Sequence, residues 1–247
     1  MENKTDFIFG IRSVIEAIRS GKEIDKILIS KGLTGELVQE MLAGLKEANI
    51  PLQYVPIEKL NRITRKNHQG VIAFIAAVTY HQLDTLIPGL FEQGKVPFLL
   101  LLDGLTDVRN IGAIARTAEC AGVDAIIIPE KGSAQINADA VKTSAGALHF
   151  IPVCRVKGMV NTIKYLKDCG LKIISATEKA SDIYFHCNLK EPLALVLGAE
   201  DTGVDPDLVR LSDEHIRIPI QGHIESLNVS AAASVLIYEV VKQRMGE

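Results

Sequence analysis

The 247-residue sequence has no apolar run of the roughly 18 to 20 residues that a membrane-spanning helix needs. Its first ten residues, MENKTDFIFG, carry charges throughout and lack the basic and apolar regions of a secretory signal. The cysteines are scattered without a CxxC pair, which is typical of reduced thiols rather than of disulfides or a zinc site. They are Cys120, Cys154, Cys169 and Cys187. We therefore expect a cytoplasmic protein that does not bind a membrane.

The common phosphate-binding and catalytic motifs are also missing. No GxGxxG follows a predicted strand and no GxxxxGK[ST] occurs, which disfavours NAD and ATP as ligands. HExxH and GxSxG are absent, and the six histidines show no metal-ligand spacing. We therefore expect neither a metal site nor a serine nucleophile. A cofactor that has no pyrophosphate remains compatible with this sequence.

Charge is nearly balanced, and the net charge of −3 argues against binding nucleic acid by bulk charge alone. One segment departs from this balance, since residues 59–68 contain four cations and no acid. The four are Lys59, Arg62, Arg65 and Lys66. Such a segment is either a solvated basic face or a surface that contacts RNA phosphates.

The pattern of apolar residues predicts an α/β protein in two parts. Residues 1–78 alternate short strands and helices, residues 79–95 read as a linker, and residues 96–247 form the second part. The strands of the second part are continuous apolar runs, as in a parallel sheet covered by helices on both faces. We expect strands at 24–29, 52–55, 70–78, 96–102, 125–128, 172–176 and 193–197, and helices at 36–48, 111–121, 158–169 and 227–244.

Two segments follow apolar strands, where α/β proteins place ligands. In the first, residues 103–116, Asn110 is placed to cap a helix and Arg116 lies off its apolar stripe. In the second, residues 195–204, Gly198 permits close backbone approach to a ligand and Glu200 follows it. Each segment alone is also compatible with a purely structural role.

The third segment, residues 218–230, joins a short strand containing Pro219 to the last predicted helix. Ser226 or Asn228 is placed to cap that helix. The helix is apolar almost all round, so it must be buried in the core or in a subunit interface. Its largest apolar residues toward the end are Leu236, Ile237, Val240 and Val241.

Together the three segments resemble the signature motifs of the SpoU/TrmH family of RNA ribose methyltransferases, of the SPOUT class. The motif NxGxxxR spans 110–116, the strand–glycine–acid motif spans 197–200, and the third motif spans 218–230. The stretches Phe9-Gly10 and His68-Gln69-Gly70-Val71 look like the RNA-binding domain that precedes the catalytic domain in many members. Two positions depart from the family pattern, Val108 in place of a proline and Asp201 in place of a glycine.

The resemblance implies a SPOUT domain with a deep trefoil knot, S-adenosylmethionine as cofactor and a homodimer in which the last helix contacts a second subunit. It implies catalytic or positioning roles for five residues: Arg116, Asn110, Glu200, Ser226 and Asn228. It places the cofactor against six others: Ala176, Thr177, Gly198, Ile218, Ile220 and Leu227. RNA would contact Lys59, Arg62, Arg65 and Lys66.

Arg116 has two candidate roles within that family, a general base or an electrostatic anchor. A guanidinium has a pKa above about 12, so neutralising one at pH 7 costs at least about 7 kcal/mol. Holding a phosphate and stabilising a developing alkoxide as a cation has no such cost, and we favour this second role.

The likeness is greatest to the branch that methylates a guanosine of 23S rRNA, on the evidence of the two-part layout, residues 68–71 and residues 132–137. A tRNA guanosine 2′-O-methyltransferase is the alternative within the family. A non-catalytic RNA-binding assembly factor also suits the basic segment, but the intact motifs argue against it.

Overall fold

The structure is a computed structural model that describes residues 7–48, 50–134, 136–224 and 226–246. Its internal contacts divide the chain into two compact units, Met1–Val78 and Thr79–Glu247. This boundary coincides with the end of the first part that the sequence predicted. Each unit has a sheet of its own, and each is described separately below.

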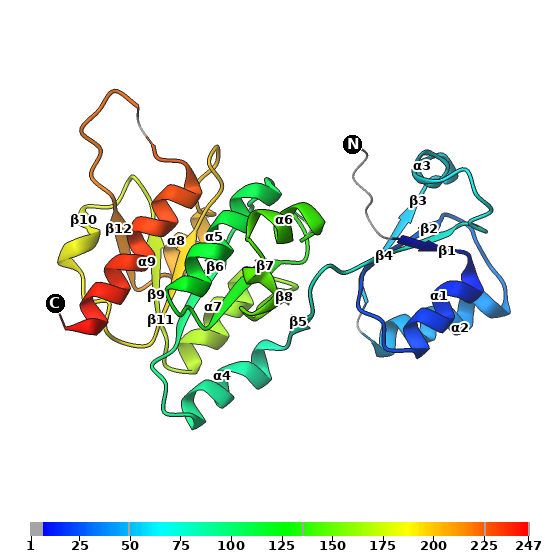
Figure 1. Ribbon diagram of the computed structural model, residues 1–247, viewed down its shortest axis with the longest axis horizontal. Coiled ribbons are helices and arrows are strands. Elements are labelled where there is room, and N and C mark those ends of the chain that lie inside the picture. The colour runs from blue at the N-terminus through cyan, green and yellow to red at the C-terminus, as the bar shows by residue number, and fades with distance from the viewer. Residues whose placement is uncertain (1–6, 49, 135, 225, 247) are drawn as a thin grey trace. The chain divides into compact units, whose positions relative to one another are not determined.

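The N-terminal unit is a four-stranded sheet with helices on both faces (Figure 1). Its strands are β1 (Phe7–Phe9), β2 (Ile24–Ser30), β3 (Leu52–Val55) and β4 (Val71–Ile75). The order is β1-β4-β2-β3, antiparallel except for the parallel pair β2–β3. Helices α1 (Ile11–Arg19) and α2 (Glu36–Glu47) cover one face, and the short α3 (Ile57–Ile63) lies on the other.

The C-terminal unit is built on an eight-stranded sheet in the order β10-β12-β9-β11-β6-β7-β8-β5. All of its strand pairs are parallel. The four strands predicted as apolar runs lie among them, and their residues are almost fully buried because helices cover both faces. The strands are β5 (Tyr80–His81), β6 (Phe98–Leu102), β7 (Ala125–Pro129), β8 (Val153–Val156), β9 (Lys172–Ala176), β10 (Asp182–Ile183), β11 (Leu193–Leu197) and β12 (Glu214–Arg217).

Two layers of helices cover this sheet. The first layer, α4 (Leu83–Glu92), α7 (Met159–Asp168) and α8 (Pro206–Leu211), shares one apolar core with the strands. The second consists of α5 (Val108–Cys120) and the elements packed against it, α6 (Ala138–Thr143), α9 (Val229–Met245) and the 3-10 turn η1 (Ala147–His149). A second 3-10 turn, η2 (Tyr184–His186), contacts α9.

The segment 79–95, expected to be a linker, instead contributes two elements to the C-terminal unit. β5 pairs with β8 at the edge of the large sheet, and Ile87 and Leu90 of α4 are buried in its core. The strand before the third motif is also shorter than expected, since β12 ends at Arg217, before Pro219. No helix within the described ranges is both long enough and apolar enough to cross a membrane.

Three of the four large apolar residues toward the end of α9 are buried within the chain itself and not in a subunit interface. Leu236, Ile237 and Val240 are at most 1% exposed within the single chain, so they cannot touch another subunit. Their apolar environment comes from the chain itself, because α9 packs against α5. Val241, the fourth residue, is half-buried.

Candidate active site

The predicted cofactor residues converge on one edge of the large sheet. β12, β9, β11 and β6 are adjacent and parallel, so their carboxyl ends lie side by side. Ala176 ends β9, Gly198 follows β11 and Ile218 follows β12. The amide of Thr177 donates to the carbonyl of Ile216 over 2.9 Å and ties two of these ends together. The carboxyl edge of a parallel sheet is where open α/β folds bind ligands.

Gly198 occupies a position that no other residue fits. A Cβ there would lie 2.0 Å from the carbonyl carbon of Gly203. The turn 198–203 is this tight because Gly203 donates to the carbonyl of Ala199 over 2.9 Å and has a φ of +69°. Loop 198–203 is therefore folded back on itself, with Glu200 at its tip.

Glu200 is the centre of a polar cluster drawn from all three motifs. Its Oε1 accepts from Asn110 Nδ2 over 3.2 Å, from the Val229 amide over 3.2 Å and from Asn228 Nδ2. Asn228 Nδ2 also donates to Asn110 Oδ1 over 3.2 Å. Residues more than 80 positions apart in sequence thus meet at one carboxylate. That carboxylate sits at the N-terminus of α9, where the exposed amides and the helix dipole favour negative charge.

Helix capping differs from the expectation at one of the two helices. Asp107, and not Asn110, caps α5, since its side chain accepts from the Arg109 amide over 2.8 Å. Asn110 lies inside the first turn, which leaves its amide free to join Glu200. Asn228 does cap α9, accepting from the Ser230 amide over 3.0 Å.

Arg116 and Ser226 stay outside this cluster. Arg116 is exposed on α5, about 9 Å along the helix axis and roughly 240° around it from Asn110. Ser226 is exposed in the loop before α9. Neither side chain bonds to another described residue, so both are available to a ligand. On the neighbouring face of α5, Thr117 Oγ1 lies 3.2 Å from Ser234 Oγ of α9.

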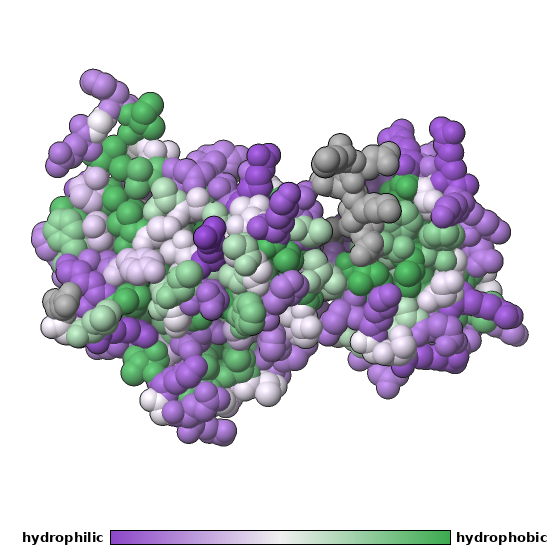
Figure 2. Space-filling model, viewed as in Figure 1, coloured by the Kyte–Doolittle hydropathy of each residue, from purple (hydrophilic) through white to green (hydrophobic). Residues whose placement is uncertain are grey.

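The loop between β12 and α9 exposes apolar side chains. Ile220 and Leu227 are 39% and 41% exposed, and Ile224 is 77% exposed. In Figure 1 this orange segment extends beyond the sheet, and Figure 2 shows green, apolar residues on it. Apolar side chains beside the carboxyl edge of a sheet suit a flat heterocycle such as adenine. The two predicted cofactor residues of this loop are therefore chemically suited to that ligand.

Two further residues were not predicted to belong to the site. Asp103, at the end of β6, accepts from the Asp205 amide over 2.8 Å and so anchors the far end of loop 198–205. Burial raises the pKa of its carboxyl. Gly112 lets α5 approach α6, because a Cβ there would lie 2.6 Å from the Ala140 carbonyl oxygen. Asp103 has no signal in the sequence beyond its position in the first motif segment, whereas Gly112 is the glycine of the NxGxxxR motif.

The basic segment lies on α3 and the loop after it. Lys59, Arg62, Arg65 and Lys66 are all outside the core, on the solvent side of the unit. Among the described residues, none of the four forms a salt bridge. Their charge is therefore not neutralised by neighbouring acids, as a phosphate-binding surface requires.

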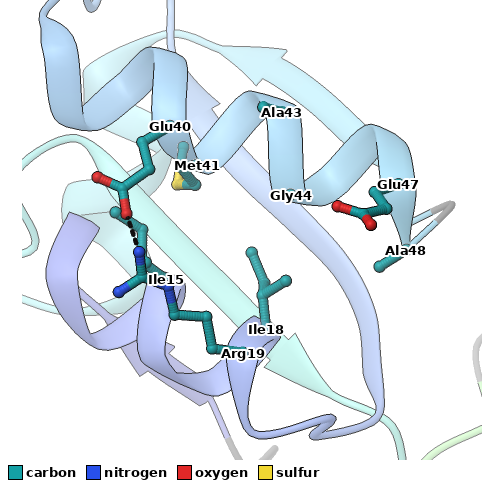
Figure 3. Close-up of a pocket in the computed structure, with 9 residues that line it drawn as sticks. All are labelled: Ile15, Ile18, Arg19, Glu40, Met41, Ala43, Gly44, Glu47 and Ala48. Atoms are coloured by element: carbon teal, nitrogen blue, oxygen red, sulfur yellow. Dashed lines mark hydrogen bonds and ion pairs between the residues drawn. The ribbon is translucent and has the colours of Figure 1, made fainter.

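A cavity of 430 Å³ in the N-terminal unit lies between α1 and α2 (Figure 3). Ile15 and Met41 line it, and an ion pair of 2.6 Å between Arg19 and Glu40 crosses it. It lies on the helix-covered face opposite α3 and contains none of the predicted site residues. Within the described part of the chain, no group of three His, Cys, Asp or Glu side chains is placed to hold a metal ion.

Comparison with known proteins agrees with this geometry. A family model described as the SpoU rRNA Methylase family matches residues 97–238, and one described as RNA 2′-O ribose methyltransferase substrate binding matches residues 7–81. The chain belongs to the SpoU methylase family. This membership makes it an RNA 2′-O-ribose methyltransferase that depends on S-adenosylmethionine, and it favours the enzyme over a purely RNA-binding assembly factor.

Relatives extend over the whole chain. A Staphylococcus saprophyticus protein named as a TrmH family tRNA/rRNA methyltransferase is 39% identical over 96% of this chain and 95% of its own length. A Bacillus subtilis protein of the same designation is 34% identical over 99% of this chain and 98% of its own length.

Solved structures share the fold of both units. The SpoU methyltransferase AviRb from Streptomyces viridochromogenes, determined with AdoMet, has a TM-score of 0.63 at 22% identity and covers 98% of this chain and 91% of its own. An AdoMet-bound rRNA methyltransferase from Sinorhizobium meliloti has a TM-score of 0.62 at 24% identity, covering 96% and 87%.

Proposed function

We propose that this protein methylates the ribose 2′-hydroxyl of a guanosine in 23S rRNA. The carboxyl-edge cluster around Glu200 supports an active site there, because it joins the three motifs through one carboxylate. The rRNA assignment is supported by the description of the family model and by residues 68–71 and 132–137, of which Gln135 lies outside the described residues. The relatives are named for both tRNA and rRNA, so a tRNA guanosine is the second candidate.

The cofactor would bind at the carboxyl edge, where the residues suit it. Ala176, Thr177, Gly198 and Ile218 offer backbone groups at adjoining strand ends, and Ile220 and Leu227 offer apolar surface for the adenine. When bound, S-adenosylmethionine supplies an electrophilic methyl group. The chain does not need a glycine-rich phosphate cradle, because this cofactor has no pyrophosphate.

Arg116 would act as an electrostatic anchor for the substrate. Its exposed guanidinium forms no bond with another described residue, so it is free to hold the phosphate beside the reacting ribose. A fixed cation there would also stabilise negative charge that develops on the 2′-oxygen. Glu200, Asn110 and Asn228 would position the loops around the ribose, and Ser226 would contact substrate or cofactor from the loop before α9.

We further propose that the protein works as a homodimer in the cytoplasm. Tyr238 is 50% exposed and Met245 is 74% exposed, seven residues apart and so on the same side of α9, with half-buried Val241 between them. This exposed apolar strip, rather than Leu236, Ile237 or Val240, would contact the second subunit. The four cysteines are all free, which suits a reducing compartment. Sedimentation as a monomer at micromolar concentration would contradict the dimer.

The test of the substrate assignment is a map of 2′-O-methylated riboses in cellular RNA with and without this protein. We expect one guanosine of 23S rRNA to lose its methyl group when the protein is removed and to regain it on complementation. The purified protein with S-adenosylmethionine should then modify that site in an rRNA transcript. Loss of methylation at a tRNA position alone would instead support the second candidate.

A further inference from the structure

The face of the N-terminal sheet that carries α3 also carries three phenylalanine rings. Phe7 and Phe9 are two positions apart on β1 and therefore point to the same face of the sheet. Phe74 of β4 is the direct cross-strand partner of Phe7. The ring centroid of Phe7 lies 6.2 Å from those of both Phe9 and Phe74. Phe9 and Phe74 are tilted by 48° and 56° relative to Phe7, and the three rings form one contiguous aromatic cluster over β1 and β4, called the platform below.

The platform is not sealed into the core. Helix α3 has only seven residues, and its buried Leu60 belongs to a small core cluster against which the three rings pack with one side. The three rings are half-buried rather than buried, so each keeps part of its surface in solvent. The opposite face of the same sheet, by contrast, is covered by two helices of 9 and 12 residues.

Cations flank the platform. Lys26 Nζ lies 5.2 Å from the centroid of Phe74, and Lys66 Nζ lies 5.8 Å from that of Phe9. Lys66 belongs to the basic segment, so the charged residues predicted to contact RNA lie next to the aromatic ones. A surface that alternates rings and lysines complements the alternating bases and phosphates of a nucleic acid strand.

The loop that carries Lys66 is held in place by three hydrogen bonds. His68 is 7% exposed, and its two ring nitrogens bond to Asn61 Oδ1 over 2.9 Å and to the Gly70 amide over 3.0 Å. Gln69 Oε1 accepts from the amide of Ile11, the first residue of α1, over 3.1 Å. The basic loop is therefore fixed relative to β1 before any ligand arrives.

We propose that Phe7, Phe9 and Phe74 stack unpaired nucleobases of the RNA substrate while Lys26 and Lys66 hold the adjoining phosphates. Bases in a duplex already stack on their neighbours, whereas the faces of unpaired bases are open to aromatic side chains. The inference rests on the proposed RNA substrate and adds that the N-terminal unit selects single-stranded nucleotides of that RNA.

The first test replaces the three rings by leucine, which keeps apolar packing but cannot stack. Binding of the full-length protein is measured for a single-stranded oligoribonucleotide and for a hairpin duplex of equal length. We expect at least about a tenfold loss for the single strand, little change for the duplex, and an unchanged salt slope because stacking releases no counterions. Tyr54→Leu is the matched control, since Tyr54 pairs with Ile29 and so points to the opposite face.

The second test does not depend on the triple variant folding. The chain has no tryptophan, so the Phe9→Trp variant carries one indole in the platform and the Tyr54→Trp variant carries one on the other face. Single-stranded RNA should quench the indole fluorescence of Phe9→Trp and leave that of Tyr54→Trp unchanged. Unquenched indole fluorescence in a saturated complex of Phe9→Trp, or wild-type protein that binds duplex but not single strands, would overturn the platform. Calorimetric binding of S-adenosylmethionine tests the proposed function separately, because it requires only the C-terminal unit.

Discussion

The C-terminal unit gathers its polar groups at one point, whereas the N-terminal unit spreads its cations over a surface. Glu200 alone receives three donors from two distant parts of the chain. The four cations of segment 59–66 form no salt bridge with any acidic side chain that the structure describes. A site whose groups converge on one point should lose its activity when one residue is changed. RNA binding by a distributed basic surface should instead weaken gradually as cations are removed.

Arg116→Ala should show the largest effect. Loss of one preorganised charged donor lowers the rate by about 10² to 10³, and Arg116→Lys should restore little because lysine lacks the planar fork. Single-turnover methylation with saturating RNA and cofactor measures this step. Arg210→Ala removes another exposed arginine, from α8, and should be neutral. More than about a tenth of the wild-type rate in Arg116→Ala would make Arg116 a simple surface cation.

Gly198→Ala should come next, because its Cβ would overlap the backbone of Gly203. Overpacking of this kind costs about 1 to 3 kcal/mol, so cofactor affinity should fall by about 10- to 100-fold as loop 198–203 shifts. Calorimetric titration with S-adenosylmethionine is the measurement. Gly89→Ala serves as the control, since Gly89 lies inside α4 with open space around it. Equal affinities of the two variants for S-adenosylmethionine would show that Gly198 is not part of the cofactor site.

The sequence predicted features that depend on local patterns better than features that depend on tertiary packing. The motifs predicted residues that the structure brings together at the carboxyl edge, because strand ends and glycine turns leave local patterns. The cap of α5 was misassigned since Asp107 and Asn110 are both good capping residues three positions apart. Burial of Leu236 in the core or in an interface stayed open in the sequence, because apolar periodicity cannot distinguish burial by the same chain from burial by a partner. The platform was missed because only register brings Phe7 beside Phe74.

Substitutions in the basic segment should have a smaller effect than those at the carboxyl-edge site. Replacing Lys59, Arg62, Arg65 and Lys66 by alanine should weaken RNA binding by about 10- to 100-fold near physiological salt and flatten its salt dependence. Cofactor affinity should hardly change. The control removes four exposed cations on or next to α1 and α2: Arg12, Arg19, Lys22 and Lys46. Similar losses in both quadruple variants would mean that net charge, and not this segment, attracts the RNA.

Asp103→Asn should have the smallest effect, and it should be stabilising. Burial raises the carboxyl pKa above its ordinary 3.8, with the charge of Asp205 adding to the rise and the Asp205 amide opposing it. The stability that Asp103 contributes is thus present below pH 3.8 and is lost as pH rises through the raised pKa. At pH 7 asparagine avoids the cost of a buried charge and still offers an oxygen to that amide.

The gain should stay below about 0.5 kcal/mol, since solvent screens a half-exposed carboxylate, and it should vanish toward about pH 4. Asp213→Asn is the control of opposite sign. Burial alone would raise the Asp213 pKa, but bonds from Lys167 and the Ile173 amide lower it overall. Its contribution is present above pH 3.8 and is lost as pH falls through the lowered pKa, so that variant should be less stable at pH 7. Thermal unfolding of both variants from about pH 4 to 8 gives the comparison. A less stable Asp103→Asn at pH 7 would show that the charge itself is needed to hold loop 198–205.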